Sequence, residues 1–111
     1  MISEKFIGTG VAVTTPFTNN NKVDHGALKK HINYLLSNGI NYFVVLGTTG
    51  ESVTLNEIEK QEVLNTFIET NDGKLPIVLG LGGNNTQSIL DKIKNTDLNG
   101  VDALLSVAPY Y

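Results

Sequence analysis

Short apolar runs alternate with longer segments of helical pattern along this chain of 111 residues. Four strands are predicted, within residues 6–15, 42–46, 76–81 and 103–107. The run at 42–46 is apolar throughout, which is typical of a strand buried on both faces of a parallel sheet. Strands that are separated by helices indicate βαβ units and therefore an α/β fold.

Three helices are expected between these strands, because apolar residues recur there at helical spacing. The first helix follows Asp24, which suits an N-cap. Thr54 and Glu57 have the spacing of a capping box and predict the start of the second helix, which ends at residues 71–73. The third helix is predicted over residues 86–95.

Four strands with three intervening helices fit two architectures. One is a (β/α)8 TIM barrel, of which residues 1–111 would supply roughly the first four strands and three helices. The other is a doubly wound, flavodoxin-like sheet. Both place ligands in the loops that follow the carboxyl ends of the strands. The flavodoxin-like fold needs a phosphate or acidic site that these loops do not show, so the barrel is favoured.

The loop of residues 47–52, Gly-Thr-Thr-Gly-Glu-Ser, is the strongest candidate site. Gly47 and Gly50 flank a hydroxyl pair, so the backbone amides and both hydroxyls could approach a ligand closely. Ahead of a helix N-terminus, such a loop suits a small carboxylate or phosphate. The alternative is a plain turn in which Ser52 or Thr54 caps the next helix. The loop matches neither a Walker A motif nor G-x-G-x-x-G, which disfavours nucleotide binding by those routes.

The other three loops carry weaker signals. Residues 14–17 begin with two threonines, which could line a polar site but are common at strand ends for their β propensity, the interpretation that we favour. Residues 80–84 are rich in glycine and are interpreted as a turn or a close backbone contact. Tyr110 and Tyr111 follow the fourth strand, where their hydroxyls could relay protons or pack at an interface.

Composition and charge exclude several classes of function. The net charge is −3 and no basic stripe is present, so nucleic acid is not an expected partner. The chain has no cysteine, which excludes disulfides and thiolate metal sites. His25 and His31 are interpreted as surface or packing residues of the first helix, and no metal site is expected. No apolar run is long enough to cross a membrane, and a cytoplasmic location is expected.

Three motifs, taken in order and with their spacing, identify a known family. Residues 10–17, residues 47–52 with Thr54-Leu55, and the final Pro-Tyr-Tyr of residues 109–111 resemble the dihydrodipicolinate synthase and N-acetylneuraminate lyase family. The likeness covers essentially the whole chain. The Thr-Thr pair with Pro-Tyr-Tyr is similar to the synthase branch, although related sugar-acid aldolases and dehydratases also have Thr-Thr.

The resemblance implies a TIM barrel that condenses pyruvate with aspartate semialdehyde through a lysine Schiff base, on the route to diaminopimelate and lysine. It implies no metal and no organic cofactor. Thr49 and its amide would hold the pyruvate carboxylate, next to Gly47, and Thr48 would pass protons in a relay with Tyr111. Because Tyr111 would serve the site of a neighbouring subunit, the resemblance also implies a homotetramer built from tight dimers.

Two residues that the family needs do not occur in this sequence. Its Schiff-base lysine follows strand 6 and a further relay tyrosine follows strand 5, and both positions lie beyond Tyr111. The eight lysines of this chain fall before strands, in loops or on helices. We therefore expect residues 1–111 to be the N-terminal half of a single catalytic barrel domain and to be inactive alone. A non-catalytic half-barrel that binds a small carboxylate or dimerises is the alternative.

Lysine feedback is expected to be weak or absent. Of the positions that bind lysine in sensitive members of the family, Asn84 and Tyr110 match. Glu57, Lys60 and Ser88 stand where such members have two histidines and a glutamate. Ser88 removes a charge that would pair with the lysine ammonium, and Lys60 adds a like charge.

Overall fold

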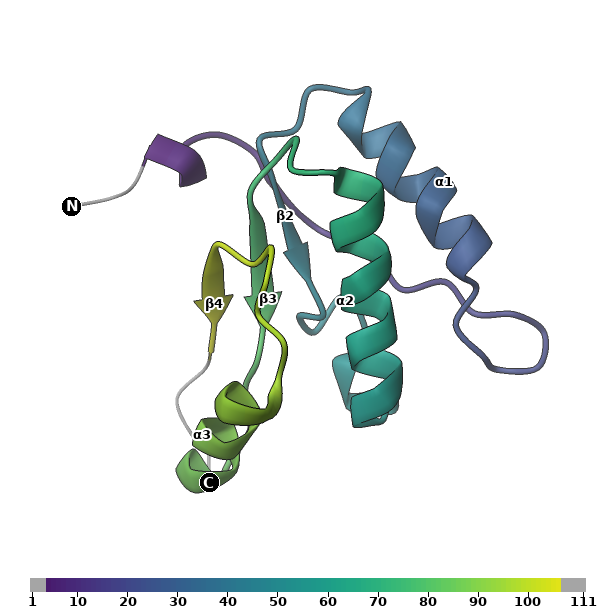
Figure 1. The fold of residues 1–111 in the computed structure, drawn as a ribbon. Helices are drawn as coiled ribbons and strands as arrows, with labels where there is room; N and C mark the ends of the chain where they lie inside the picture. Colours follow the sequence, from purple (N-terminus) through teal and green to yellow (C-terminus); the bar gives the residue numbers. More distant parts are fainter. Residues whose placement is uncertain (1–3, 107–111) are drawn as a thin grey trace.

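A computed structural model of the chain describes residues 4–106. Its strands form one parallel sheet, and a helix follows each of the first three strands (Figure 1). The elements are the 3-10 helices η1 (Glu4–Phe6) and η2 (Ser52–Thr54), the strands β1 (Gly10–Ala12), β2 (Tyr42–Val45), β3 (Ile77–Gly80) and β4 (Ala103–Leu105), and the helices α1 (His25–Leu36), α2 (Glu57–Asn71) and α3 (Thr86–Asn95).

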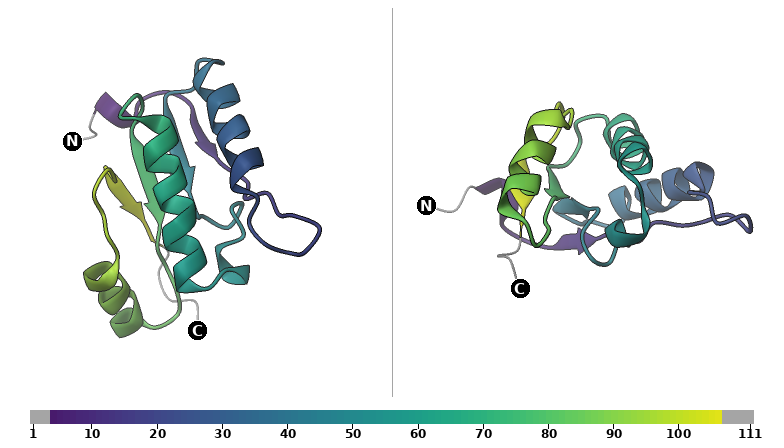
Figure 2. Two further views of the ribbon diagram at one scale, coloured as in Figure 1. Left: turned by 45° about the vertical axis from the view of Figure 1, so that its right-hand side comes forward. Right: turned by 90° about the horizontal axis from the view of Figure 1, so that it is seen from below.

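The order of the strands in the sheet decides between the two expected architectures. The strands lie in the order β1-β2-β3-β4, and the three helices lie on one side of the sheet (Figure 2). A doubly wound sheet reverses its strand order and carries helices on both faces. A barrel keeps its strands in sequence order and its helices outside. The chain therefore has the arrangement of consecutive barrel units, and the flavodoxin-like alternative is wrong.

The core lies between the sheet and the helices. The register pairs Phe43 with Ile77 and Val45 with Leu79, and these side chains are at most 3% exposed. The ring of Phe43 meets that of Phe67 on α2 edge-on, with centroids 5.8 Å apart. Burial of aromatic and branched side chains is the main force that holds α2 on the sheet.

Among residues 4–106, the opposite face of the sheet carries no α-helix (Figure 2). Ala12, Val44, Val78 and Ala103 are neighbours in register across the four strands. In a closed barrel, residues at such positions fill the interior in layers. Leu105, at the end of β4, is 51% exposed in this chain. This face is the one that would point into a barrel.

The strands are shorter than the sequence predicts. Only Gly10–Ala12 of the run at 6–15 pairs with β2, because η1 occupies the start of the chain and Gly8 takes a positive φ of 116°. Strand β2 stops at Val45, since Leu46 adopts a left-handed φ of 58°. Strand β4 ends at Leu105, and residue 107 lies outside the described part of the chain.

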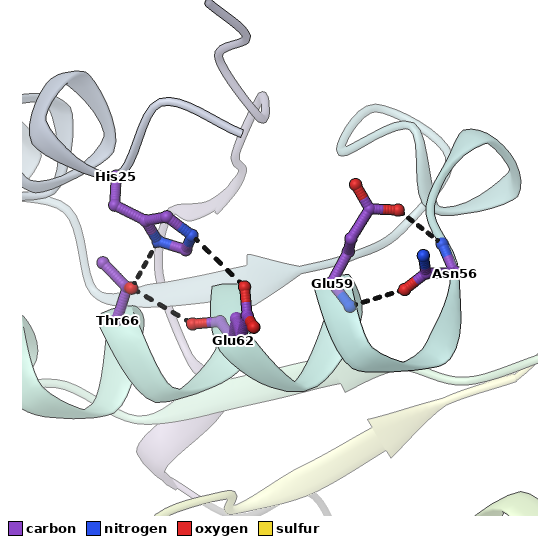
Figure 3. Close-up of polar contacts among 5 residues, drawn as sticks. All are labelled: His25, Asn56, Glu59, Glu62 and Thr66. Atoms are coloured by element: carbon purple, nitrogen blue, oxygen red, sulfur yellow. Dashed lines mark hydrogen bonds and ion pairs between the residues drawn. The ribbon is translucent and has the colours of Figure 1, made fainter. Parts of the chain in front are cut away.

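The predicted capping box of α2 is wrong by two residues. The Asn56 side chain accepts from the Glu59 amide at 2.8 Å, and Glu59 accepts from the Asn56 amide at 2.9 Å (Figure 3). Thr54 instead belongs to η2 and donates to the Glu51 carbonyl. The 3-10 turn takes up the residues that would have begun the helix, so α2 starts at Glu57.

The other helix starts agree with the sequence. Asp24 caps α1 by accepting from the Ala27 amide at 2.9 Å. Helix α3 covers Thr86–Asn95 as predicted, and Asn85 caps it through the Ser88 amide at 3.0 Å. Both caps satisfy amides that have no partner inside their helix.

Candidate functional site

The loop of residues 47–52 follows β2 at the carboxyl edge of the sheet, as the sequence predicts. The Gly50 amide donates to the Gly47 carbonyl at 3.1 Å, and the Glu51 amide donates to the Thr48 carbonyl at 3.0 Å. Thr48 and Thr49 lie at the tip of this tight turn with both residues exposed. The turn thus exposes two neighbouring threonines, a residue type whose hydroxyl and backbone amide can both donate to an anion.

Glycine at position 80 lets the loop pass close to the next strand. A Cβ atom on Gly80 would lie 2.4 Å from the carbonyl oxygen of Leu46 and 2.8 Å from the nitrogen of Gly47. Real Cβ atoms do not approach backbone atoms so closely, so any other residue would push the two segments apart. This geometry confirms a close backbone contact as the role of the first glycine in the run at 80–84.

Thr15 forms a hydrogen bond with the backbone of the same loop at Gly50. Its side chain is buried, at 4% exposed, and its hydroxyl donates to the Gly50 carbonyl at 2.7 Å. Thr15 does not line the pocket, so it is not part of a polar site there, and its hydroxyl has a specific backbone partner that neither sequence interpretation included. Thr14, its neighbour, is exposed. The sequence could not reveal the contact, since its partners lie 35 positions apart.

A pocket of about 190 Å³ joins this loop to the ends of β3 and β4. Its lining comes from three parts of the chain that are far apart in sequence: Leu46, Gly47, Thr48, Ser52 and Val53; Gly80, Leu81, Gly82 and Gly83; and Leu105. The carboxyl ends of parallel strands meet at one edge, which is why these loops converge. Four of the ten lining residues are glycines and four are apolar, and Thr48 and Ser52 are the two that carry a polar side chain.

The structure brings together some of the site residues that the sequence identifies. Gly47 and Thr48 line the pocket. Thr49 is adjacent in the turn, but it is exposed and is not part of the lining. Asn84 is exposed in the turn before α3, also outside the lining. Tyr110 and Tyr111 lie outside the described residues.

A separate polar cluster lies at the other edge of the sheet, where Asp102 precedes β4. The hydrogen bond from the Lys5 ammonium lowers the pKa of Asp102, burial opposes this effect, and the hydrogen bond from the Ile77 amide lowers the pKa further. The two donor atoms lie 2.9 and 3.0 Å from the carboxylate oxygens. Because this edge is opposite the candidate site, the cluster is structural.

His25 packs between α1 and α2, in agreement with the sequence interpretation. Its Nδ1 lies 2.7 Å from the Thr66 hydroxyl, which itself donates to the Glu62 carbonyl oxygen at 3.1 Å (Figure 3). Its Nε2 lies 3.9 Å from a carboxylate oxygen of Glu62. His31 is half-buried on α1.

Two further properties concern residues 4–106 alone. Within that range, no group of three or more His, Asp or Glu side chains is arranged to hold a metal ion. In the same part of the chain, no helix is both long and apolar enough to cross a membrane.

Comparison with known proteins places these features in a family. The sequence profile of the Dihydrodipicolinate synthetase family matches residues 5–111. The 4-hydroxy-tetrahydrodipicolinate synthase of Flavobacterium psychrophilum is 50% identical over 108 residues, which are 97% of this chain and 37% of that protein. The enzyme of the same name from Staphylococcus carnosus is 46% identical over 110 residues, which are 99% of this chain and 37% of that protein.

Solved structures give the same result for the fold. The dihydrodipicolinate synthase of Thermotoga maritima superposes with a TM-score of 0.90 at 40% identity, over 97% of this chain and 36% of that one. The chain thus spans about a third of the length of its relatives. It has the fold of the first part of a TIM barrel, and it belongs to the dihydrodipicolinate synthetase family.

Proposed function

We propose that this chain is the N-terminal part of a 4-hydroxy-tetrahydrodipicolinate synthase, a lyase that condenses pyruvate with aspartate semialdehyde in lysine biosynthesis. The observation that carries the proposal is the loop of residues 47–52, in which the exposed Thr48 and Thr49 lie at the carboxyl edge of the sheet, beside a small pocket. In TIM barrels this edge holds the chemistry.

Pyruvate is a small anion, and the loop suits it. The exposed Thr49 offers an amide and a hydroxyl to the carboxylate, and Gly47 leaves room for the ligand beside the backbone. The related synthase of Acinetobacter baumannii, at 36% identity and a TM-score of 0.88 over 94% of this chain and 36% of that one, was solved in complex with pyruvate. We assign the same ligand to this loop.

The proposed chemistry is that of a class I aldolase. A lysine amine adds to the ketone of pyruvate and water leaves, giving a protonated imine. The imine withdraws electrons, so the methyl carbon can lose a proton to form an enamine, which attacks the aldehyde of the second substrate. Thr48, on the pocket wall, would pass the protons that these steps require, in a relay with Tyr111. This route requires no metal and no organic cofactor.

The Schiff-base lysine would come from a part of the barrel beyond residue 111. Among the described residues, the pocket that Thr48 lines contains no lysine. Residues 1–111 would then be the N-terminal half of the catalytic barrel, although they span only about a third of the length of the relatives, and they would be inactive alone. The sheet face that carries Leu105, 51% exposed here, would be covered when the barrel closes. The proposal includes a cytoplasmic homotetramer, a dimer of tight dimers in which Tyr111 serves the neighbouring site.

The identity of the second substrate is tested by supplying two aldehydes in separate reactions. The full-length protein that contains this chain is incubated with pyruvate and either aspartate semialdehyde or a sugar aldehyde, and the consumption of pyruvate is followed. We expect pyruvate to be consumed with aspartate semialdehyde. Consumption with the sugar aldehyde alone would instead identify a sugar-acid aldolase of the same family. No consumption with either would favour a non-catalytic module that binds a carboxylate.

A further inference from the structure

We infer that Thr15 is a positioning residue for pyruvate: it fixes the direction of the Thr49 amide through a relay of two peptide planes. This inference rests on the proposed function, because it deepens the role of the same loop. Thr15 itself is buried beneath the loop, at 4% exposed, and is absent from the pocket lining. It acts through the backbone of the turn and not by touching the ligand.

The first peptide plane of the relay joins Gly50 to Glu51. Its carbonyl accepts from the Thr15 hydroxyl at 2.7 Å, and its amide, on Glu51, donates to the Thr48 carbonyl at 3.0 Å. A peptide group is planar, so its carbonyl and amide turn together. A donor on the carbonyl side therefore holds the direction in which the Glu51 amide points.

The second peptide plane joins Thr48 to Thr49. Its carbonyl is the acceptor of the Glu51 amide. Its amide is the Thr49 N–H, which is the group that we assign to the pyruvate carboxylate. Because this group is also planar, the bond to its carbonyl sets the direction of its N–H. The Thr15 hydroxyl is thus connected to the ligand-facing amide by two rigid groups and two hydrogen bonds.

Packing around Gly50 makes this relay stiff. Gly50 is buried, and a Cβ atom there would lie 3.2 Å from the backbone of Leu46 and from the Val13 carbonyl oxygen. Water has little access to its carbonyl, so loss of the Thr15 donor would leave a buried acceptor unpaired. The Gly50–Glu51 peptide would then turn to find another partner, and the Thr49 amide would turn with it. An amide that has turned away would hold the pyruvate carboxylate less tightly, because a hydrogen bond weakens as its angle departs from linear.

The test uses the full-length protein and variants at position 15. Thr15→Val keeps the shape and removes the donor, whereas Thr15→Ser keeps the donor and removes a methyl group. Thr9→Val is the matched control, because Thr9 is exposed before β1 and contacts Asn41 through its backbone. Kinetic constants for pyruvate are measured well below the melting temperature of each variant.

We expect Thr15→Val to raise the KM for pyruvate about tenfold, equivalent to about 1.4 kcal/mol. Thr15→Ser should return the KM to within about threefold of the parent, and Thr9→Val should leave it unchanged. A valine variant that melts earlier but keeps the parent KM would overturn the inference, since Thr15 would then only stabilise the fold. If Thr15→Val does not fold, Thr15→Cys replaces it, and its weak S–H donor should give a smaller rise in KM.

A second readout separates this inference from the proposed function. The amide resonances of Thr49 and Glu51 are compared between the parent protein and the variants without any ligand. We expect Thr15→Val to shift both resonances and Thr15→Ser to restore them. If the parent fails to bind pyruvate, the proposed function is wrong, yet these shifts still test the relay. Unchanged resonances in a folded Thr15→Val protein would refute the relay whatever the ligand.

Discussion

The ammonium of Lys5 lies 2.9 Å from the carboxylate of Asp102 and so joins the first 3-10 helix to the start of β4. The same carboxylate accepts from the Ile77 amide at 3.0 Å, while the Asp102 amide donates to the Ile77 carbonyl at 2.8 Å. The Asp102 side chain thus connects η1, β3 and β4 at the amino edge of the sheet. The candidate site lies at the opposite edge, so we expect these contacts to affect stability.

Removing the charge of Asp102 should lower the stability of the protein in a pH-dependent manner. In the folded chain the Lys5 hydrogen bond holds the pKa of Asp102 below its usual value. Its contribution is therefore complete above the unfolded pKa of about 4 and is lost as the pH falls through the folded pKa. We expect Asp102→Asn to cost about 1 kcal/mol of unfolding free energy at neutral pH. The ion pair adds little, because the Lys5 side chain is 58% exposed.

Denaturant unfolding of the two proteins at a series of pH values measures this effect. The difference in unfolding free energy between the parent and Asp102→Asn should shrink as the pH falls below about 4. If this difference stays constant from neutral pH to below about pH 4, the charge of the carboxylate contributes nothing to stability. Lys29→Met, at an exposed position of α1, is the control for loss of a surface charge.

Position 80 should not tolerate a side chain. A Cβ atom there would lie 2.4 Å from the Leu46 carbonyl oxygen, so Gly80→Ala forces the backbone apart, at a cost of about 1–3 kcal/mol. Gly83→Ala is the matched control, because the nearest atom to its Cβ would be on Ile89 at 3.9 Å. Unfolding free energies in urea compare the two variants. Equal stability of both would contradict the close contact between β3 and the loop after β2.

His25 and Thr66 should be energetically coupled. Nδ1 of His25 lies 2.7 Å from the Thr66 hydroxyl, and this contact joins helices α1 and α2. A double-mutant cycle with His25→Leu and Thr66→Val isolates this contact. We expect a coupling of about 1 kcal/mol in unfolding free energy. Additive effects of the two substitutions would mean that the pair contributes nothing beyond packing.

Free lysine should inhibit the full-length enzyme weakly or not at all. Ser88 offers no charge to a lysine ammonium. The ammonium of Lys60 lies 3.4 Å from the Glu57 carboxylate and adds a like charge at the start of α2. Initial rates at rising lysine concentration test this expectation. An inhibition constant in the micromolar range would show that other residues form the regulatory site.

Local sequence patterns predicted the features that depend on neighbouring residues. The Asp24 cap and the bounds of α3 follow from side chains within one helical turn. The capping box of α2 was misplaced because Thr54 with Glu57 and Asn56 with Glu59 have the same spacing. The 3-10 turn that decides between them depends on how the preceding loop folds, and spacing alone carries no information about that.

The candidate site was predicted in part, for the same physical reason. The glycine and hydroxyl pattern of residues 47–52 identified the loop, and the parallel sheet placed it at the carboxyl edge. The contacts that hold the loop come from other strands: Thr15 reaches Gly50 across 35 positions, and Gly80 lies against Leu46. Such contacts depend on strand order and register, which a single sequence does not specify.

The most direct test of the account is the intact mass of the full-length protein after incubation with pyruvate and reduction by borohydride. Reduction traps an imine as a stable amine, so a Schiff-base enzyme gains one pyruvyl unit for each chain. We expect this gain, with the modified lysine mapped by peptide analysis to a position beyond Tyr111. No adduct, or an adduct on one of the eight lysines of residues 1–111, would contradict the proposed function.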